Sequence, residues 1–429
     1  MKKTIYTLLV LLSSLLLQHA SIAQKTILLK CGKLLDTKEG KVVENKFVLL
    51  KGNVIVSISN TASKADSTID LTNYFVMPGM IDAHTHVLLQ GDITSEDYDV
   101  QVLKESIPYR TLRASKSAER AILNGFTTIR DLGTEGAGFA DVDVKKAINK
   151  GVITGPRMQV ATLAMNTTGH YPIKASDYAW ELKLPKGVIE ITGADEARKA
   201  VRQQIEQGAD WIKIYADRGY YRLADGSFRS LPNFTTEEIT AIGDETLRSR
   251  KKLAAHAMTR DGILAAIQAG AISIEHGSGM DEECMKLMSE KGIYWCPTLF
   301  VNEYVAEGRA KLGSPINLYF QQSIENTFKK AIKMGVKLTY GTDIGGYDWG
   351  LPQAADFSYF VKWGLTPIQA IQTATTTAAE LLGMQGKIGE IKEGAFADII
   401  ALKKDPTKDI NTLQQVDWVM KDGKVYKNE

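Results

Sequence analysis

Cysteine is scarce in this sequence of 429 residues, which contains three. Cys31, Cys284 and Cys296 are too few and too scattered for a disulfide framework, and an odd number leaves at least one thiol unpaired. We interpret Cys296, in the apolar segment 294–297, as a small core residue rather than as a nucleophile. The sequence therefore excludes the class of small, disulfide-stabilised proteins.

An excess of charge of one sign is also absent. The chain has 52 Lys and Arg residues against 50 Asp and Glu residues, and two of the lysines lie in an N-terminal segment that we expect to be removed. The remaining balance gives no reason to expect binding to nucleic acid or to an anionic membrane surface. No glycine-rich phosphate-binding motif stands at the end of a predicted strand, which disfavours dinucleotide-binding and P-loop proteins.

Long apolar runs are confined to the N-terminus, where residues 1–23 have the pattern of a signal peptide. Lys2 and Lys3 precede the apolar run 8–17, and small residues at 21–23 fit a cleavage site. The alternative is a short membrane anchor, but the run is too short to span about 30 Å of hydrocarbon. We therefore predict an exported protein, periplasmic or extracellular, without stable insertion in a membrane.

Both ends of the mature chain are rich in short strand patterns separated by glycine turns. Strands are indicated at 26–30, 46–50 and 53–56, and again at 397–402 and 416–420, with a hairpin turn at 421–424. We predict that residues 24–77 and 386–429 together form one small β-sandwich domain.

The middle of the chain, residues 78–385, alternates between strands and helices. Eight short apolar strands are indicated, and helical stretches such as 194–207, 236–252, 261–269, 282–291 and 317–334 lie between them. Eight strand-then-helix units over roughly 300 residues are typical of a (β/α)8 TIM-like barrel. The predicted fold class is therefore α/β, a barrel with a small β-sandwich domain.

Histidine is rare, and its placement is informative. Five histidines follow the predicted signal peptide, and each lies at or just after the carboxyl end of a predicted barrel strand, where barrel enzymes build their active sites. His84 and His86 form His-Thr-His, so both imidazoles share one strand face and suit one metal ion. Asp82 shares that face, and it has two open roles: orienting a ligand imidazole or satisfying buried backbone groups.

The segment 78–86, Pro-Gly-Met-Ile-Asp-Ala-His-Thr-His, resembles the amidohydrolase superfamily of metal-dependent hydrolases. The resemblance covers nearly all of the mature chain, including the closing segment 386–398. It is strongest to the branch that holds Xaa-Pro dipeptidases, N-acyl amino acid amidases and imidazolonepropionase-like proteins.

The resemblance implies a set of metal ligands that hold one or two divalent ions, with zinc as the expected metal. Lys213 would be carboxylated and would bridge two ions; the alternative is an unmodified lysine paired with Asp343 around a single ion. The implied ligands are His84, His86, Lys213, His256, His276 and Asp343.

The resemblance also implies catalytic roles. A metal-activated hydroxide would attack the substrate carbonyl, and Asp343 would take its proton and pass it to the leaving amine. His170, after the third strand, would bind the substrate and donate to the developing oxyanion, or else pack within its loop.

This sequence departs from the dipeptidase pattern in two places. Met258 stands where a tyrosine often follows the fifth-strand histidine, and the loop after Lys213 lacks the usual pair of glycines. We hypothesise that an arginine of this loop, with a neighbouring tyrosine, binds the substrate carboxylate instead; the alternative is a solvated charged loop. The candidate substrate-binding residues are Tyr215, Arg218, Tyr220 and Arg222.

The sequence thus predicts an exported metal-dependent amidohydrolase that cleaves amide bonds in small molecules such as dipeptides or N-acyl amino acids. Two alternatives remain: a cyclic-amide hydrolase of the imidazolonepropionase type, and a non-catalytic barrel that binds metal. The expected partner is a small-molecule substrate, and association into a homo-oligomer is left open.

Overall fold

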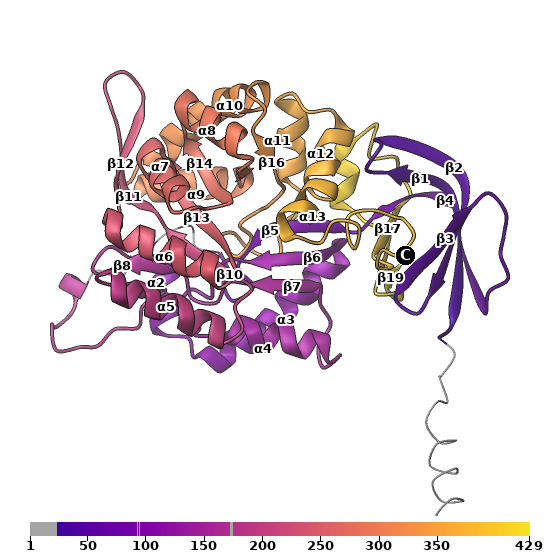
Figure 1. Ribbon diagram of the computed structural model, residues 1–429, viewed down its shortest axis with the longest axis horizontal. Coiled ribbons are helices and arrows are strands. Elements are labelled where there is room, and N and C mark those ends of the chain that lie inside the picture. Colours follow the sequence, from indigo (N-terminus) through magenta and orange to yellow (C-terminus); the bar gives the residue numbers. More distant parts are fainter. Residues whose placement is uncertain (1–23, 92, 94, 172–174) are drawn as a thin grey trace, which may run out of the picture.

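The computed structural model describes residues 24–91, 93, 95–171 and 175–429. The predicted signal peptide, residues 1–23, lies outside the described residues. Within the described ranges, no helix combines the length and the apolar character needed to cross a membrane. Figure 1 shows a large body of mixed helices and strands on one side and a sheet of strands from both chain ends on the other.

Two parallel sheets form the centre of the large body. The first has the order β5-β6-β7, and the second has the order β16-β15-β14-β13-β10-β8-β9. The strands of the first sheet are β5 (Met80–Thr85), β6 (Phe126–Asp131) and β7 (Arg157–Val160). The strands of the second are β8 (Met165–Thr167), β9 (Ile189–Ile191), β10 (Trp211–Tyr215), β13 (Lys252–Thr259), β14 (Ser273–Gly279), β15 (Tyr294–Cys296) and β16 (Lys337–Leu338).

Backbone hydrogen bonds join these two sheets at both ends of the first one. The amide of Asp210 donates to the carbonyl of Val160 over 2.8 Å, which links β7 to the start of β10. The amide of Asp343 donates to the carbonyl of His84 over 2.7 Å, which links β5 to the segment after β16. All eight predicted strands of the middle region are present, each within three residues of the predicted position.

Helices cover the outside of the parallel strands in Figure 1, and their ends follow local sequence signals. Helix α6 begins at a capping box in which Thr235 and Glu238 satisfy each other's backbone amides. Helix α8 ends at Gly292, whose φ of 65° suits glycine. The five predicted helices correspond to α5 (Ala194–Glu206), α6 (Thr236–Arg248), α7 (Arg260–Gln268), α8 (Glu282–Lys291) and α10 (Ile316–Lys333).

Several elements were not predicted from the sequence. A hairpin, β11 (Asp217–Arg222) and β12 (Phe228–Pro232), follows β10 directly. The further helices are α2 (Ser95–Leu103), α3 (Ile107–Leu123), α4 (Ala140–Asn149), α9 (Leu299–Lys311), α11 (Asp356–Lys362), α12 (Pro367–Thr373) and α13 (Thr376–Leu382).

The strands of both chain ends form one mixed sheet of seven, with the order β19-β18-β17-β4-β1-β2-β3. Its own apolar core includes Leu29, Val48 and Trp418. The predicted hairpin turn is present at Asp422-Gly423, where φ angles of 50° and 74° suit a tight two-residue turn. The strands are β1 (Thr26–Asp36), β2 (Lys41–Lys51), β3 (Val54–Ser59), β4 (Ser67–Pro78), β17 (Ile399–Leu402), β18 (Trp418–Lys421) and β19 (Lys424–Asn428).

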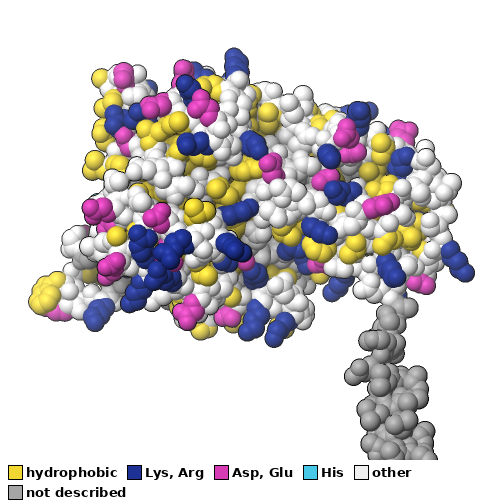
Figure 2. Space-filling model, in the orientation of Figure 1, with side chains coloured by type: hydrophobic (Ala, Val, Ile, Leu, Met, Phe, Trp, Pro, Cys, Tyr) yellow, Lys and Arg dark blue, Asp and Glu magenta, His cyan; other side chains and the backbone are white. Residues whose placement is uncertain are grey.

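Strands β5, β6, β10 and β15 are buried along their whole length, as parallel strands covered by helices are. In β10 all five residues, Trp-Ile-Lys-Ile-Tyr, are buried, so Lys213 is a charged residue type in an apolar environment. On the outside, Figure 2 shows side chains of both charges across the visible face, in keeping with the balanced composition. The balanced surface charge therefore does not explain why ionisable side chains such as Lys213 are buried inside the molecule.

Candidate active site

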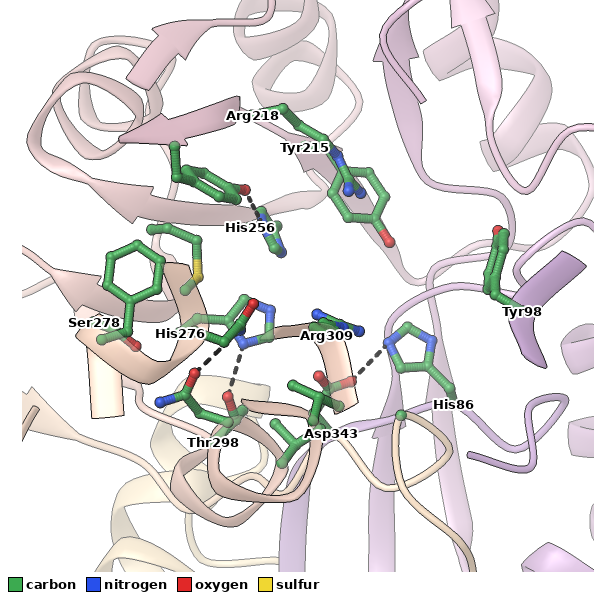
Figure 3. Close-up of a pocket in the computed structure, with 18 of the residues that line it drawn as sticks. His86, Tyr98, Tyr215, Arg218, His256, His276, Ser278, Thr298, Arg309 and Asp343 are labelled. Carbon is green, nitrogen blue, oxygen red and sulfur yellow. Dashed lines mark hydrogen bonds and ion pairs between the residues drawn. The ribbon is translucent and has the colours of Figure 1, made fainter. Parts of the chain in front are cut away.

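All six predicted metal ligands line one cavity at the carboxyl ends of the parallel strands. The cavity measures about 450 Å³, which suits a small-molecule ligand. Figure 3 shows His86, His256, His276 and Asp343 pointing toward a common space. We call these six residues the histidine wall: His84, His86, Lys213, His256, His276 and Asp343.

His84, His86 and Asp343 form the tightest group of this wall. Oδ1 of Asp343 lies 3.2 Å from Nε2 of His86 and 3.5 Å from Nε2 of His84. Nε2 of His84 is buried without a hydrogen-bond partner, and the three ligand atoms lie within 4.8 Å of one another. A buried polar atom without a partner is costly, so this group fits a bound cation.

Two residues of the wall have left-handed backbone conformations. The φ angle is 71° at His276 and 58° at Asp343, values that side chains with a Cβ rarely adopt. Strain of this kind persists where the surrounding structure enforces it, and it is concentrated at functional sites.

Each imidazole of the wall is held through one ring nitrogen. The other nitrogen is left free to bind a ligand, except in His86, where it lies 3.2 Å from Oδ1 of Asp343. Nδ1 is the held atom in three of them, and a metal-binding imidazole needs such a partner to fix its orientation. The partners are Glu275 Oε2 at 2.9 Å for His84, the Gly133 carbonyl at 2.8 Å for His86, and Thr298 Oγ1 at 2.7 Å for His276.

His256 is held in the opposite sense. Its Nε2 lies 2.7 Å from the hydroxyl of Tyr220, so Nδ1 is the atom left free. Its ring centroid is 4.5 Å from that of His276, which places two imidazoles side by side on this part of the wall. Tyr220 therefore orients a predicted ligand rather than offering its hydroxyl to a substrate.

Glu275 is a buried anchor that the sequence analysis did not identify. Its Oε1 accepts hydrogen bonds from Arg130 over 2.9 Å and from Ser273 over 2.6 Å, while its Oε2 faces His84. Burial alone would raise the pKa of Glu275, but the charge of Arg130 and the contact with His84 hold it well below its usual range. An ionised Glu275 is a strong acceptor for the N–H of His84.

The two open roles of Asp82 are resolved in favour of the backbone. Its Oδ1 accepts hydrogen bonds from the amides of His84 and Thr342, each over 3.1 Å. Its Oδ2 accepts from the Thr342 hydroxyl and from Gln353 over 2.6 and 2.9 Å. Asp82 thus fixes the backbone between two strands, and Glu275 performs the imidazole contact.

Lys213 is 1% exposed and lies in the wall without a partner. Among the described residues it has no hydrogen bond and no ion pair within 4.0 Å, and both its carboxylation and the alternative pairing with Asp343 around a single ion stay predictions. Burial lowers the pKa of Lys213. An uncharged amine is the form that can be modified.

Burial also controls the charge of the imidazoles. It lowers the pKa of His84 to about 4 and that of His276 to about 3, so both rings are neutral near pH 7, as metal binding requires. For His86 burial acts in the same direction, but the hydrogen bond and charge of Asp343 outweigh it and raise the pKa to about 9.

The predicted substrate-binding residues separate into two groups. Tyr215, Arg218 and Tyr220 line the cavity. Arg222 is exposed, lies outside the lining and packs near Tyr319, so this arginine matches the alternative of a solvated side chain. His170 is likewise exposed and is not part of the lining, and its role stays a prediction.

Beside the histidine wall, the cavity has a second wall that the sequence analysis largely missed. Three tyrosine hydroxyls meet the carboxylate of Glu135 there, and the guanidinium of Arg218 lies 4.8 and 4.5 Å from two of the rings. We call these residues the tyrosine wall: Tyr98, Glu135, Tyr171, Tyr215 and Arg218. Glu135 follows the end of β6. Its position after a strand, the signal that identified the histidines, could therefore have identified Glu135 as well.

Met258 completes the cavity on a third side. It is buried with Phe228 and Phe320 in a small apolar cluster. The position that carries a tyrosine in the resembling dipeptidases is therefore part of an apolar surface here.

The fold and the cavity together define the class of this protein. The chain belongs to the amidohydrolase family, whose family model matches residues 75–426. Members of this family typically bind divalent metals, in agreement with the candidate ligand group of His84, His86 and Asp343. The chain is a hydrolase that acts on carbon–nitrogen bonds of amide-type substrates.

Individual relatives agree with this assignment. The chain is 32% identical to the ochratoxinase of Aspergillus niger, over 92% of this chain and 85% of the relative. It is 23% identical to the imidazolonepropionase of Flavobacterium psychrophilum, over 88% and 93% of the two chains. The solved structure of a Xaa-Pro dipeptidase with bound methionine superposes with a TM-score of 0.83 at 33% identity, covering 94% of this chain and all of the other.

Proposed function

We propose that this protein is an exported amidohydrolase that cleaves the amide bond of small substrates with a free carboxylate, namely dipeptides or N-acyl amino acids. The observation that carries the proposal is the histidine wall, where four imidazoles are each held through one ring nitrogen and line one cavity together with Lys213 and Asp343. We propose further that the two joined parallel sheets form one closed barrel, residues 78–385, in which the eight predicted strands are the staves and β8 and β9 are additions, beside a composite β domain of residues 24–77 and 386–429.

The six residues of the histidine wall would hold one or two divalent ions, with zinc as the first candidate. A divalent ion in this place would activate water and polarise the substrate carbonyl. The proposal that Lys213 is carboxylated, and so offers two oxygens to two ions, is supported by its burial without a partner.

The remaining chemistry belongs to the chain itself. Asp343 has its carboxylate at the cavity, and the neighbouring imidazoles hold its pKa well below the usual range although burial acts the other way. We assign it the transfer of a proton from the attacking water to the leaving nitrogen. Donation by His170 to the oxyanion would require this exposed side chain to reach the cavity.

Arg218 is the candidate for the substrate carboxylate. Its Nε is buried without a hydrogen-bond partner, and the guanidinium has no ion pair within 4.0 Å among the described residues. A guanidinium binds a carboxylate through two parallel hydrogen bonds. Tyr215 supports it through ring contact, because its hydroxyl already donates to Glu135.

A cyclic-amide hydrolase is the second candidate, motivated by the similarity to imidazolonepropionase. Export would disfavour it, since the predicted signal peptide would direct the protein out of the cytoplasm. N-terminal sequencing of the secreted protein tests export: a mature chain that begins near Gln24 supports it, and a chain found uncleaved in the cytoplasm contradicts it.

A substrate screen tests the proposed function. Enzyme loaded with zinc, with bicarbonate present, is assayed on dipeptides, N-acyl amino acids and cyclic amides, with Asp343→Asn as the inactive control. We expect turnover of linear amides with a free carboxylate. Turnover restricted to cyclic amides would favour the second candidate, and tight metal binding with no turnover of any amide would favour a non-catalytic barrel.

A further inference from the structure

Glu135 is the one acidic residue that lines the cavity outside the histidine wall, among the residues that the structure describes. It is 3% exposed, and its φ of 47° is rarely adopted by side chains with a Cβ. The guanidinium of Arg110 holds this strained turn, since its Nη2 donates to the carbonyls of Thr134 and Glu135 over 3.0 and 2.9 Å. The structure thus enforces the placement of a carboxylate in the cavity.

The carboxylate of Glu135 has hydroxyl donors but no cation. Tyr98 donates to it over 2.8 Å and Tyr215 over 2.7 Å, and Tyr171 donates as well. No Lys, Arg or His nitrogen of the described chain lies within 4.0 Å of it. A buried carboxylate is normally paired with an opposite charge. Arg110, Arg218 and His86 act on Glu135 only from beyond 4.0 Å, so its carboxylate lacks a cation in direct contact.

The surroundings of Glu135 suit an ammonium group in particular. Burial and the charge of Glu135 raise the pKa of Tyr98 and Tyr171 well above the usual value, so both stay protonated. Each hydroxyl that donates to Glu135 keeps its lone pairs as acceptors. An ammonium has three donors and no acceptor, and it is also attracted to aromatic ring faces.

The position of Glu135 relative to the histidine wall identifies which ammonium it would bind. A Cβ placed on Gly133 would lie 3.3 Å from Oε1 of Glu135 and 3.4 Å from Cε1 of His86, so the carboxylate is a near neighbour of a predicted ligand. In a dipeptide one carbon separates the α-ammonium from the scissile carbonyl. A site for that ammonium must therefore lie directly beside the groups that act on the carbonyl, as Glu135 does.

Arg218 lies at the other side of Tyr215. Tyr215 has the guanidinium 4.5 Å from its ring centroid, while its hydroxyl reaches Glu135. Lys213 and His256 of the histidine wall lie 5.7 and 4.9 Å from the same centroid. Two extended residues span about 7 Å, so one dipeptide can reach both charged groups while its amide bond faces the histidine wall.

We propose that the tyrosine wall is a subsite for a zwitterion, in which Glu135 binds the free α-ammonium of a dipeptide. The proposal deepens the proposed function, on which it rests: of the two substrate classes named there, it selects dipeptides over N-acyl amino acids. Within the tyrosine wall, Glu135 and the tyrosine hydroxyls then recognise the amino end of the dipeptide, and Arg218 recognises its carboxyl end.

The test compares two substrates that differ in the ammonium alone, alanyl-phenylalanine and N-propionyl-phenylalanine, on zinc-loaded full-length enzyme. For the unmodified protein we expect a kcat/KM for the dipeptide about 10- to 100-fold higher than for the N-propionyl compound, the range expected for hydrogen bonds to a charged group. In Glu135→Gln this ratio should fall toward one, with metal content unchanged. Glu245→Gln is the matched control and should keep the ratio. It removes a carboxylate of α6 that pairs with Arg202 of α5, away from the cavity.

The possible results separate the two proposals. If the unmodified enzyme cleaves both substrates equally well, or prefers the N-propionyl compound, the ammonium subsite is wrong while the amidohydrolase function stands. The same holds if Glu135→Gln lowers both values of kcat/KM by the same factor. If neither substrate nor any other linear amide is cleaved, the proposed function itself has failed. Because the ratio of the two kcat/KM values is measured on the unmodified protein, a ratio of one or less contradicts the ammonium subsite even if the variant does not fold.

Discussion

The two walls of the cavity are built in different ways. The histidine wall comes from strand ends, with His84 in β5, Lys213 in β10 and His256 in β13, and its imidazoles are each held by one hydrogen bond. The tyrosine wall is assembled mainly from connecting segments and a helix: Tyr98 from α2, Glu135 from the loop after β6, and Arg218 from β11. One wall is fixed by the sheet, and the other by the segments between its strands.

We infer from this difference that the histidine wall cleaves the amide bond and that the tyrosine wall selects the substrate. Strand ends in a packed sheet hold side chains at fixed positions, as bond cleavage requires. Connecting segments vary without disturbing the sheet, so they are the natural place for substrate recognition. Changes in the histidine wall should therefore abolish turnover of every substrate, and changes in the tyrosine wall should redistribute turnover among substrates.

The largest effect is expected from Lys213→Ala. Loss of this residue removes a predicted bridging ligand, so kcat/KM should fall by about 10³-fold or more for every substrate, with loss of bound metal. Lys252→Ala is the control, because Lys252 lies at the opposite end of a barrel strand and donates to the carbonyl of Leu381. Metal content and kcat/KM are measured together. A Lys213→Ala variant with full activity and two ions would overturn the carbamate assignment.

The next largest effect is expected from Arg218→Ala. We expect kcat/KM for substrates with a free carboxylate to fall at least about 30-fold, the cost of removing one partner of a buried charge pair. The matching amides, which lack the carboxylate charge, should lose much less. Arg222→Ala is the control, since this exposed side chain lies outside the cavity. Equal losses for acid and amide substrates would assign Arg218 a purely structural role.

The sequence was informative about the histidine wall because its residue types are rare and placed at recurring points of the pattern. Five mature histidines at strand ends are easily noticed, and a lysine inside the buried strand Trp-Ile-Lys-Ile-Tyr conflicts with its apolar neighbours. Both signals are local. Eight of the ten strands of the two parallel sheets were predictable for the same reason, since they are short apolar runs, whereas the three-residue strands β8 and β9 were missed.

The tyrosine wall was harder to predict because its members meet only in three dimensions. Tyr98 and Tyr215 are separated by more than a hundred residues, yet both donate to Glu135. Tyrosine occurs 16 times in the chain, so its presence in a loop carries little information. The hairpin that positions Arg218 was missed because its strand, Asp-Arg-Gly-Tyr-Tyr-Arg, is polar and exposed, without the alternation of a half-buried strand.

The variant Glu275→Gln tests whether metal binding depends on the groups that orient the imidazoles as well as on the imidazoles themselves. The amide loses the charge that accepts from His84, so metal affinity should fall by about 10- to 100-fold, as for other groups that orient a metal-binding imidazole. Competition with a chelator measures the affinity, and circular dichroism checks that the variant is folded. The dipeptide-to-propionyl ratio should not change at saturating metal. A changed ratio would show that the two walls are coupled.

The smallest effect is expected from Tyr98→Phe, which removes one of the three hydroxyls from Glu135 and keeps the ring. One hydrogen bond of this kind contributes about 1 kcal/mol, so the ratio of kcat/KM between the dipeptide and its N-propionyl analogue should fall by about fivefold. Metal content and turnover of the N-propionyl compound should change little, because Tyr98 forms its hydrogen bonds with Glu135 and Tyr171 and not with the histidine wall. A loss of metal in this variant would mean that the tyrosine wall supports the histidine wall. The assignment of recognition to one wall and chemistry to the other would then be wrong.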